Sequence, residues 1–174
     1  ILPAPTRFAG GRLRVMDGPQ SALFDAQTRK RAFATRFTAG AANRQGVALV
    51  HDGAPFASQT AGLLSDFITP GDIQTTGAGT PTILLADCQT IGGYPRLGTV
   101  IPADLPVVAQ ARPGTALWFV PITLDEAAQV TPPEPMLLAG LRKALRPLIR
   151  RPHDIPDLLG YQLISGVVRG DEEA

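Results

Sequence analysis

The stretch PTILLADCQTIGGYPRLGTVI (Pro81–Ile101) decides the fold class of this 174-residue chain. It opens with the apolar run Ile83–Leu85, which is typical of a strand in a core position. A polar, glycine-containing loop follows over residues 86–95, and residues 96–101 predict a second strand. We therefore expect a β-rich domain in which this loop is either a tight turn or a rim that faces a ligand.

Similar patterns on both sides of this stretch predict further short strands and turns, with little helix. The 17 prolines and 18 glycines also favour many turns over a helical bundle. A cap at Ser21 and an apolar face predict a helix over residues 21–34. Residues 52–71 are polar and only weakly patterned. Strands are expected at 11–16, 34–39, 46–51, 72–76 and 115–123, and short helices at 102–111 and 124–129.

The residue pattern changes from short strands to helix at TPPEP (Thr131–Pro135). Residues 136–151 have the leucine spacing of an amphipathic helix, which Pro147 should kink, and residues 157–170 predict a second short helix. We therefore divide the chain into a compact domain, residues 1–131, and a helical extension, residues 132–174. The apolar stripe of the extension needs cover, either on the barrel flank or against another subunit, so a homo-oligomer through this tail is one option. The stripe comprises Leu137, Leu138, Leu141, Leu145 and Leu148.

The composition excludes several classes of protein. Apolar residues make up 44%, charged residues 18%, and the net charge is +1, which argues against a disordered chain and against a nucleic-acid binder. No apolar stretch approaches the roughly 20 residues that cross a bilayer, so no membrane span is expected. A single cysteine excludes an internal disulfide and fits a cytoplasmic location. The start at Ile1 does not follow the plan of a signal peptide and suggests a fragment or a trimmed chain.

Several familiar catalytic and binding motifs are missing from the sequence. Cys88 stands alone, and His51 and His153 lie far apart, so no metal site is expected. The segment GAGTPT lacks the lysine and the following helix of a phosphate-binding loop, and no Gly-x-Ser-x-Gly elbow occurs. Nothing near Cys88 in sequence would lower its pKa, which disfavours a nucleophilic role.

The loop at residues 86–95 holds most of the candidate site residues. Asp87 follows the buried strand, where it either caps the next turn or serves as a base. Gln89 and Thr90 offer neutral groups that suit an amide or ureido ligand. Gly92 and Gly93 either bring backbone N–H groups close to a ligand or serve a turn. The remaining candidate in this loop is Tyr94, which is otherwise a half-buried packing residue.

Two further segments contribute candidates from elsewhere in the chain. Arg44, in the loop NRQG, either clamps a carboxylate or carbonyl group or is a solvated surface arginine. Gln74 could project from a short strand that follows the Pro70-Gly71 turn signal. The basic residues of the helix at 136–151 lie toward its end, where the helix dipole favours cations, so they do not indicate nucleic-acid binding.

The segment GDIQTTGAGTPTILLADCQTIGGYPRLGTVIPADLPVVAQARPG resembles a known family. The family pattern is Pro-Gly-x-Ile-Gln, then Asp-x-Gln-Thr-x-Gly-Gly-Tyr-Pro, then Thr-Val-Ile-x-Ala-Asp-Leu, and RVMDGPQ also matches it. The family comprises allophanate hydrolase subunit 2, the biotin-dependent carboxyltransferase domain of urea amidolyase, and the C subunit of 5-oxoprolinase. The resemblance covers about residues 11–125, which match the second half of members about twice as long. Members often have Arg-Met-Gly-Tyr where this chain has RQGV, so the aromatic residue is missing here.

The resemblance implies a fold and several functions. The fold would be mainly β, a cyclophilin-like antiparallel barrel with short flanking helices, followed here by the helical C-terminal tail. The leading function is a subunit of an ATP-dependent 5-oxoprolinase, which opens 5-oxoproline hydrolytically to glutamate. The alternative within the enzyme class is a biotin-dependent urea carboxyltransferase. A third option is a non-catalytic regulatory partner of a histidine-kinase inhibitor. The fragment alone is expected to be inactive.

The resemblance also implies roles and partners. The partners would be an allophanate hydrolase subunit 1-type subunit and a lactam-utilisation-type subunit, with a small amide or lactam as substrate. Asp87 and Arg44 would then be catalytic. ATP would act in the assembled enzyme, at a site that this sequence does not locate, and biotin would act under the alternative. The substrate-binding residues would be Gln74, Gln89, Thr90, Gly92, Gly93 and Tyr94.

Overall fold

The computed structural model describes residues 10–58, 63–146 and 153. The helices are η1 (Ser21–Leu23), α1 (Ala26–Ala34), η2 (Pro102–Asp104), α2 (Leu105–Ala109), α3 (Leu124–Val130) and α4 (Glu134–Ala144). The strands are β1 (Gly11–Met16), β2 (Arg36–Ala42), β3 (Gly46–Val50), β4 (Asp66–Phe67), β5 (Asp72–Thr75), β6 (Pro81–Leu84), β7 (Ile91–Gly92), β8 (Arg96–Val100) and β9 (Ala116–Pro121).

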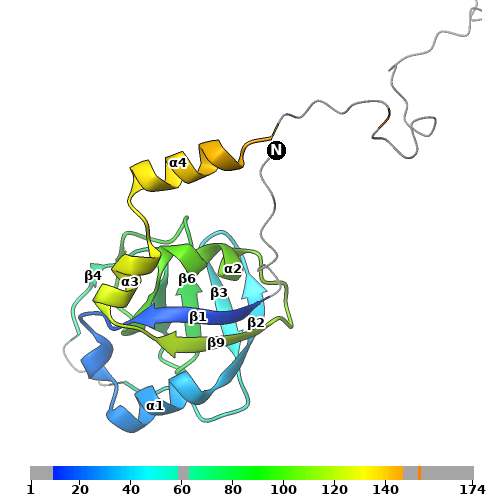
Figure 1. Cartoon of the computed structure of the whole chain (residues 1–174). Helices are drawn as coiled ribbons and strands as arrows, with labels where there is room; N and C mark the ends of the chain where they lie inside the picture. The colour runs from blue at the N-terminus through cyan, green and yellow to red at the C-terminus, as the bar shows by residue number, and fades with distance from the viewer. Residues whose placement is uncertain (1–9, 59–62, 147–152, 154–174) are drawn as a thin grey trace, which may run out of the picture. The chain divides into compact units, whose positions relative to one another are not determined.

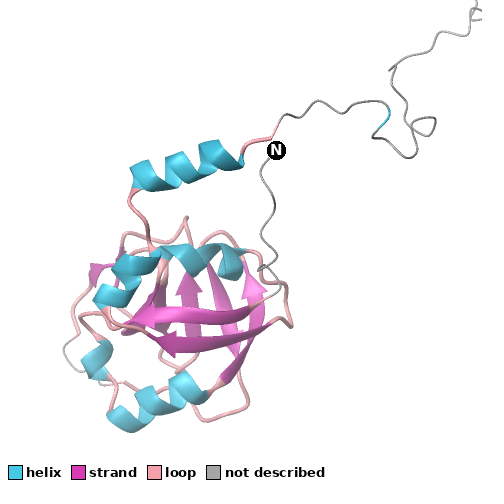
Figure 2. Cartoon of the chain, viewed as in Figure 1, coloured by secondary structure: helices cyan, strands magenta, loops and turns pink. Residues whose placement is uncertain are grey.

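Seven of the described strands close into a barrel in the order β1-β8-β5-β6-β3-β2-β9 (Figures 1 and 2). The mainly-β barrel with short flanking helices is therefore confirmed. The prediction of a wholly antiparallel barrel is wrong at one pair of strands. β1 pairs with β9 in parallel, with Gly11 opposite Leu117 and Val15 opposite Pro121. The two other described strands, β4 and β7, form a separate two-stranded sheet. Neither β4 nor β7 was predicted from the sequence pattern.

Alternation along the strands fills the barrel interior. In β3, Val47 and Leu49 are buried while Ala48 between them is only half-buried. Such a period of two places alternate side chains inside and outside the wall. The barrel strands contribute most of the buried core: Leu13, Val15, Phe37, Ala39, Val47, Leu49, Ile73, Ile83, Leu97, Val100, Leu117 and Phe119.

The helix predicted over residues 21–34 is divided in two. Ser21 opens only a 3-10 turn, and its hydroxyl instead donates to the Leu97 carbonyl. The α1 helix begins after Asp25, whose carboxylate accepts from the Thr28 N–H at 2.7 Å. The predicted cap at Ser21 is therefore wrong for α1, since an aspartate nearer the helix satisfies its first amides. In the view of Figure 1, α1 lies below the barrel strands and α2 and α3 lie above them.

The Pro70-Gly71 signal does mark a turn, and the turn is tightly packed. Gly71 has φ +99°, and a Cβ there would lie 2.6 Å from the Val100 carbonyl oxygen. Its N–H donates to Leu84 and its carbonyl accepts from Val100. Only glycine meets both the dihedral and the space that this turn needs, so the turn fixes where β5 enters the barrel.

Among the described residues, internal contacts divide the chain between Leu137 and Leu138. The α4 helix crosses that boundary, so the division predicted at residues 131–132 stays a prediction. Leu137, Leu138, Leu141 and Leu145 are all exposed, and the cover predicted for them also stays a prediction. Leu148, the Pro147 kink and the second short helix lie outside the described residues.

Candidate functional site

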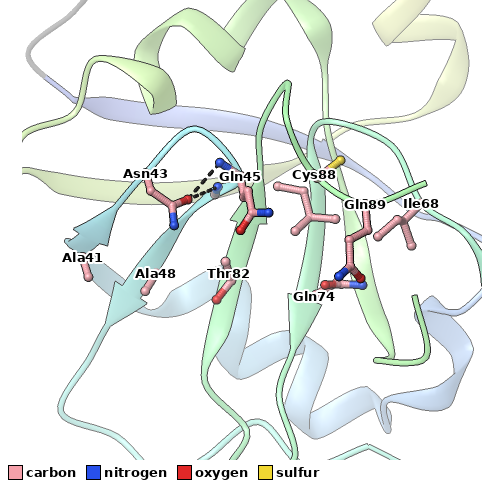
Figure 3. A pocket seen from close by; sticks show the side chains of 11 residues that line it. Ala41, Asn43, Gln45, Ala48, Ile68, Gln74, Thr82, Cys88 and Gln89 are labelled. Atoms are coloured by element: carbon pink, nitrogen blue, oxygen red, sulfur yellow. Dashed lines mark hydrogen bonds between the residues drawn. The ribbon is translucent and has the colours of Figure 1, made fainter. Parts of the chain in front are cut away.

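A row of side chains crosses the outer face of the barrel wall. In register, Ala48 of β3 lies opposite Thr82 of β6, and Thr82 lies opposite Gln74 of β5. These residues alternate with core residues on their strands, so their side chains point outward. Figure 3 shows Ala48, Thr82 and Gln74 on three neighbouring strands. The row forms the floor of a surface cavity.

That cavity has a volume of about 380 Å³. Its lining contains four side-chain carboxamides, from Asn43, Gln45, Gln74 and Gln89, and none of its described lining residues is charged. We call it the carboxamide cavity. Figure 3 shows the ends of the Gln74 and Gln89 side chains close together on one side and Asn43 and Gln45 on the other. The full lining is Ala41, Asn43, Gln45, Gly46, Ala48, Ile68, Gln74, Thr82, Leu84, Cys88 and Gln89.

Only one of the four carboxamides is engaged by the described part of the protein. The Asn43 Oδ1 accepts from the backbone N–H groups of Gln45, at 2.8 Å, and Gly46, at 3.1 Å. This Asx-type turn shapes the tip of the β2–β3 hairpin. Within the described part of the chain, the side-chain amides of Gln45, Gln74 and Gln89 make no hydrogen bond to protein groups. Each therefore keeps two donors and an acceptor for a ligand.

One side of the cavity is formed by a flap, which we define as β4 with Ile68 together with β7. Phe67 pairs with Ile91 across the two strands, and the Ile68 N–H donates to the Thr90 carbonyl at 3.1 Å. Gly92 packs directly on Gln74, because a Cβ there would lie 2.7 Å from the Gln74 Nε2. The flap therefore limits where the Gln74 side chain can lie.

Arg96 joins the flap to the barrel. Its guanidinium donates to the Phe67 carbonyl and pairs with Asp66, both in the flap, and pairs with Asp72 of β5 at 3.2 Å. The side chains of Arg96 and Asp72 are only 9% and 6% exposed. Gln20 completes the set, because its Oε1 accepts from the Arg96 backbone N–H and Nε. The guanidinium thus donates four hydrogen bonds to four different acceptors.

Arg44 and Asp87 lie beside a second cavity, of about 700 Å³. The Arg44 Nε lies 2.8 Å from the Asp87 Oδ2, and the two side chains are 87% and 41% exposed. The Asp87 backbone N–H donates to the Arg44 carbonyl, which ties the loop to the hairpin tip. Most of the second lining is apolar: Ala42, Asn43, Arg44, Val47, Pro70, Leu85, Ala86, Asp87, Pro102, Leu105, Pro106 and Ala109.

The structure thus brings together only part of the predicted site. Gln74 and Gln89 line the carboxamide cavity, and Gly92 lies against Gln74. Thr90 is exposed and supplies a backbone carbonyl to the flap. Gly93 and Tyr94 are also exposed, and neither belongs to the lining of the two cavities described above. The roles predicted for all of these residues, and for Asp87 and Arg44, stay predictions.

Three polar residues of this lining were not predicted from the sequence: Asn43, Gln45 and Thr82. The prediction for the segment NRQG used only the charge of Arg44. In the structure, Gln45 lines the carboxamide cavity, Arg44 lines the second cavity, and Asn43 between them and β2 lines both. These three residues form the turn between β2 and β3, where the period of two of a strand does not apply, so the sequence pattern offers no signal for this division. Thr82 lies in the cavity because it is opposite Gln74 in the pairing of β5 with β6, and the sequence alone does not define this register.

Cys88 lines the carboxamide cavity, and its surroundings favour the protonated thiol. Burial raises the pKa of the Cys88 thiol, and the nearby negative charge of Asp72 raises this pKa further. Both effects disfavour the thiolate. Among residues 10–58, 63–146 and 153, no cluster of His, Cys, Asp or Glu could hold a metal ion. The same residues contain no helix with the length and hydropathy of a membrane span.

Comparisons with known proteins connect this geometry to a family. Over 120 residues the chain is 34% identical to the C subunit of 5-oxoprolinase from Escherichia coli, covering 68% of this chain and 38% of that protein. Over 81 residues it is 41% identical to the C subunit of 5-oxoprolinase from Haemophilus influenzae, covering 47% of this chain and 26% of that protein. The chain thus spans well under half the length of these two relatives.

A solved structure and a family model agree with these relatives. The urea carboxylase of Kluyveromyces lactis has a TM-score of 0.64 at 26% identity, covering 73% of this chain and 12% of that one. The family model for the carboxyltransferase domain, subdomain A and B, matches residues 2–121. That match covers the whole barrel, including both walls of the carboxamide cavity. The chain therefore belongs to the carboxyltransferase-domain family.

Proposed function

We propose that the carboxamide cavity binds a small, neutral, planar N–C=O group, as in a lactam or a urea. The observation that carries this proposal is the set of three unpaired carboxamides, from Gln45, Gln74 and Gln89, around one cavity without charged residues in its described lining. An amide ligand offers a donor and an acceptor side by side, which match the two edges of a carboxamide. Ala48, Ile68 and Leu84 supply apolar contact for the rest of the ligand.

Charge argues for the same ligand class. An ion entering this cavity would lose its hydration without meeting an opposite charge in the described lining, which is costly. A neutral amide exchanges its water hydrogen bonds for carboxamide hydrogen bonds at little net cost. Donors that point at the ligand oxygen would also stabilise the negative charge that develops there during attack on the carbonyl.

In the assembled system, this chain would be a subunit of an ATP-dependent 5-oxoprolinase that opens 5-oxoproline hydrolytically to glutamate. The two curated relatives are both named as the C subunit of a 5-oxoprolinase, which supports this choice. The partners would be an allophanate hydrolase subunit 1-type subunit and a lactam-utilisation-type subunit. The substrate carboxylate would need a cation, and Arg44 is the candidate at the hairpin tip next to Asn43 and Gln45.

Asp87 is the candidate base, and its position sets a condition on that role. Its carboxylate pairs with Arg44 at the second cavity, so the pair must open before Asp87 can accept a proton from water. Opening is inexpensive because exposed ion pairs contribute about 0–1 kcal/mol. Asp87→Asn in the assembled enzyme is expected to lower turnover about 100-fold or more. Unchanged turnover would remove Asp87 from the mechanism.

The two cofactors that the family suggests fit this chain differently. A triphosphate does not fit the carboxamide cavity, since no described lining residue is cationic and no helix N-terminus belongs to the described lining. The ureido group of biotin, a neutral N–C=O group, does fit the donors and acceptors of Gln45, Gln74 and Gln89. When bound, biotin would supply a carboxyl group for transfer. We therefore do not assign ATP to this cavity, and we keep biotin for the alternative function.

The binding proposal can be tested on the chain alone. Cys88 is the only cysteine in the sequence and lines the cavity, so its alkylation reports on one place. Bound 5-oxoproline or urea is expected to slow alkylation in a concentration-dependent way, and Gln74→Ala should abolish the protection. Gln129→Ala, an exposed glutamine on α3, is the matched control. If neither compound protects Cys88 at any concentration, amide binding at this cavity is refuted.

A second experiment separates the three functions in the assembled system. Glutamate formation with ATP hydrolysis, present only when this chain is added to its partner subunits, would support the 5-oxoprolinase function. Transfer of a carboxyl group from carboxybiotin to urea would support the alternative, which the similarity to a urea carboxylase favours. Absence of both activities, with tight binding to a histidine-kinase inhibitor, would support the regulatory role instead.

A further inference from the structure

We propose that Arg96 is a positioning residue of the carboxamide cavity, which holds the flap against the barrel and thereby sets the place of Gln74, Ile68 and Gln89. The proposal rests on the proposed function, because the importance of that placement depends on a ligand in the cavity. Arg96 does not itself belong to the lining.

The register of the barrel places Arg96 next to Gln74, on the outer face of the sheet. The outward-facing row that begins with Ala48, Thr82 and Gln74 continues to Arg96 on β8, which lies opposite Gln74. Residues opposite one another in neighbouring strands are adjacent on one face of the sheet. Arg96 is therefore the next side chain after Gln74 on the same outer face, and the flap strand β4 lies over it.

The flap depends on such an attachment. Its two strands are only two residues long each and belong to a sheet separate from the barrel. A two-stranded sheet of this size does not hold its own place in water. Two of its links to the barrel run directly to the Arg96 guanidinium, from the Asp66 carboxylate and the Phe67 carbonyl. A third link, from the N–H of Thr69 directly after the flap residue Ile68, ends on Asp72, which Arg96 also binds.

The consequence for the cavity follows from the packing. Ile68, directly after β4, is a wall residue, and Gly92 of β7 lies against the Gln74 amide. Gln89 precedes β7 in the same loop and is a wall residue as well. A flap that moved away would release Gln74 and displace Ile68 and Gln89 together. Arg96 thus acts on a ligand through three residues that touch it.

The chemistry of the side chain explains why an arginine is needed. The planar guanidinium carries five N–H donors in a fixed geometry, which here serve Gln20, Phe67, Asp66 and Asp72 at once. A lysine offers one compact charge on a flexible stem and cannot reach all four acceptors. Arg96→Lys should therefore keep the charge beside Asp72 but lose the attachment of the flap.

The sharpest test changes the exposed end of the attachment. Asp66 is 46% exposed, so Asp66→Ala removes one link while the buried pair of Arg96 with Asp72 remains. We expect hydrogen exchange at the Ile68 and Thr69 amides to accelerate about tenfold while the thermal midpoint changes little. Asp66→Glu should restore slow exchange. Asp17→Ala, which breaks the exposed pair with Arg29 outside the flap, should leave exchange unchanged.

A second measurement without ligand uses the accessibility of the Cys88 thiolate. The limiting alkylation rate of the Cys88 thiolate, measured at high pH so that the pKa does not enter, should rise about fivefold in Asp66→Ala and in Arg96→Lys. Wild-type exchange and alkylation rates in both variants would overturn the proposal.

The ligand then separates this proposal from the proposed function. If the proposed function holds, both variants should bind urea or 5-oxoproline about tenfold more weakly, with the Asp66→Glu variant near wild type. If wild-type Cys88 is not protected by either compound, the proposed function fails, and the ligand-free measurements still decide the role of Arg96. Faster exchange with unchanged affinity, in a protein that does bind these compounds, would show that Arg96 has only a structural role.

Discussion

Arg96 and Arg44 both pair with aspartates beside the cavities of this barrel, yet they do so in opposite surroundings. Arg96 is 9% exposed and its fixed acceptors surround it, whereas Arg44 is 87% exposed and meets one carboxylate at the tip of a hairpin. Burial makes the first cluster costly to break, and solvent makes the second easy to open. The same kind of ion pair can therefore serve two purposes: the buried Arg96–Asp72 pair can hold the flap in place, while the exposed Arg44–Asp87 pair can change partners.

The largest expected effect comes from breaking the buried cluster. Arg96→Ala leaves the Asp72 carboxylate buried with only Thr99 and Thr69 as donors among the described residues. We expect the free energy of unfolding to fall by about 3–5 kcal/mol, measured by urea denaturation. The double variant Arg96→Ala with Asp72→Ala should lose less than the sum of the single variants, because it leaves no unpaired charge. Simple additivity would contradict the assigned coupling.

A second variant tests the contact between the flap and the carboxamide cavity. In Gly92→Ala, the new Cβ would approach the Gln74 Nε2 to 2.7 Å, so the flexible end of Gln74 must move. We expect amide affinity to fall about tenfold while stability changes by less than about 1 kcal/mol. Gly77→Ala is the matched control, since nothing described lies within 4 Å of its Cβ position. Unchanged affinity in a folded Gly92→Ala would separate the flap from the site.

The exposed pair should contribute little to stability. Arg44→Ala is expected to change the free energy of unfolding by about 0–1 kcal/mol in urea denaturation, because solvent screens the pair. The loss should shrink further at about 1 M salt. A loss comparable to that of Arg96→Ala would mean that Asp87 and Arg44 are structural, and the comparison between the two arginines would fail.

The smallest expected effect concerns Cys88, which lies within the field of the buried cluster. Burial and Asp72 raise the pKa of the Cys88 thiol, so the folded state keeps this proton to a higher pH than the unfolded state. The free energy of unfolding should therefore fall as the pH rises from about 8.5, the ordinary thiol value, toward the folded pKa. Urea midpoints measured from about pH 7 to 10 check this, with Cys88→Ala as the control. Asp72→Asn should lower the thiol pKa.

The main strands could be predicted because the apolar pattern of the sequence is strong there. The run Ile83–Leu85 and the alternation of Gly11–Met16 each correspond to a barrel strand, β6 and β1. The two-residue strands β4 and β7 could not be predicted because they are too short to show an alternation of apolar residues. Their position depends on hydrogen bonds to Arg96, which the local sequence does not reveal. Local pattern cannot predict an element that tertiary contacts hold.

The candidate site shows the same limit. The chemistry of Gln89 and Thr90 predicted amide recognition, and the family resemblance added Gln74. Gln74 and Gln89 line the cavity, whereas Thr90 does not. Asn43, Gln45 and Thr82 were missed because their meeting depends on strand register, which a one-residue shift would undo. Arg44 and Asp87 were expected at the same site as the glutamines, but they pair with each other where the β2–β3 turn meets the loop after β6, and both line the neighbouring cavity.

The parallel pair of β1 and β9 has a consequence for how the chain folds. Gly11 and Leu117 are about a hundred residues apart, so closing the barrel costs more chain entropy than any hairpin in it. Long-range pairing of this kind slows folding. During synthesis, β1 must also wait for β9, the last barrel strand to leave the ribosome. Until then the barrel has open strand edges, which are sites of aggregation, so the unfinished chain depends on rapid completion or on chaperones.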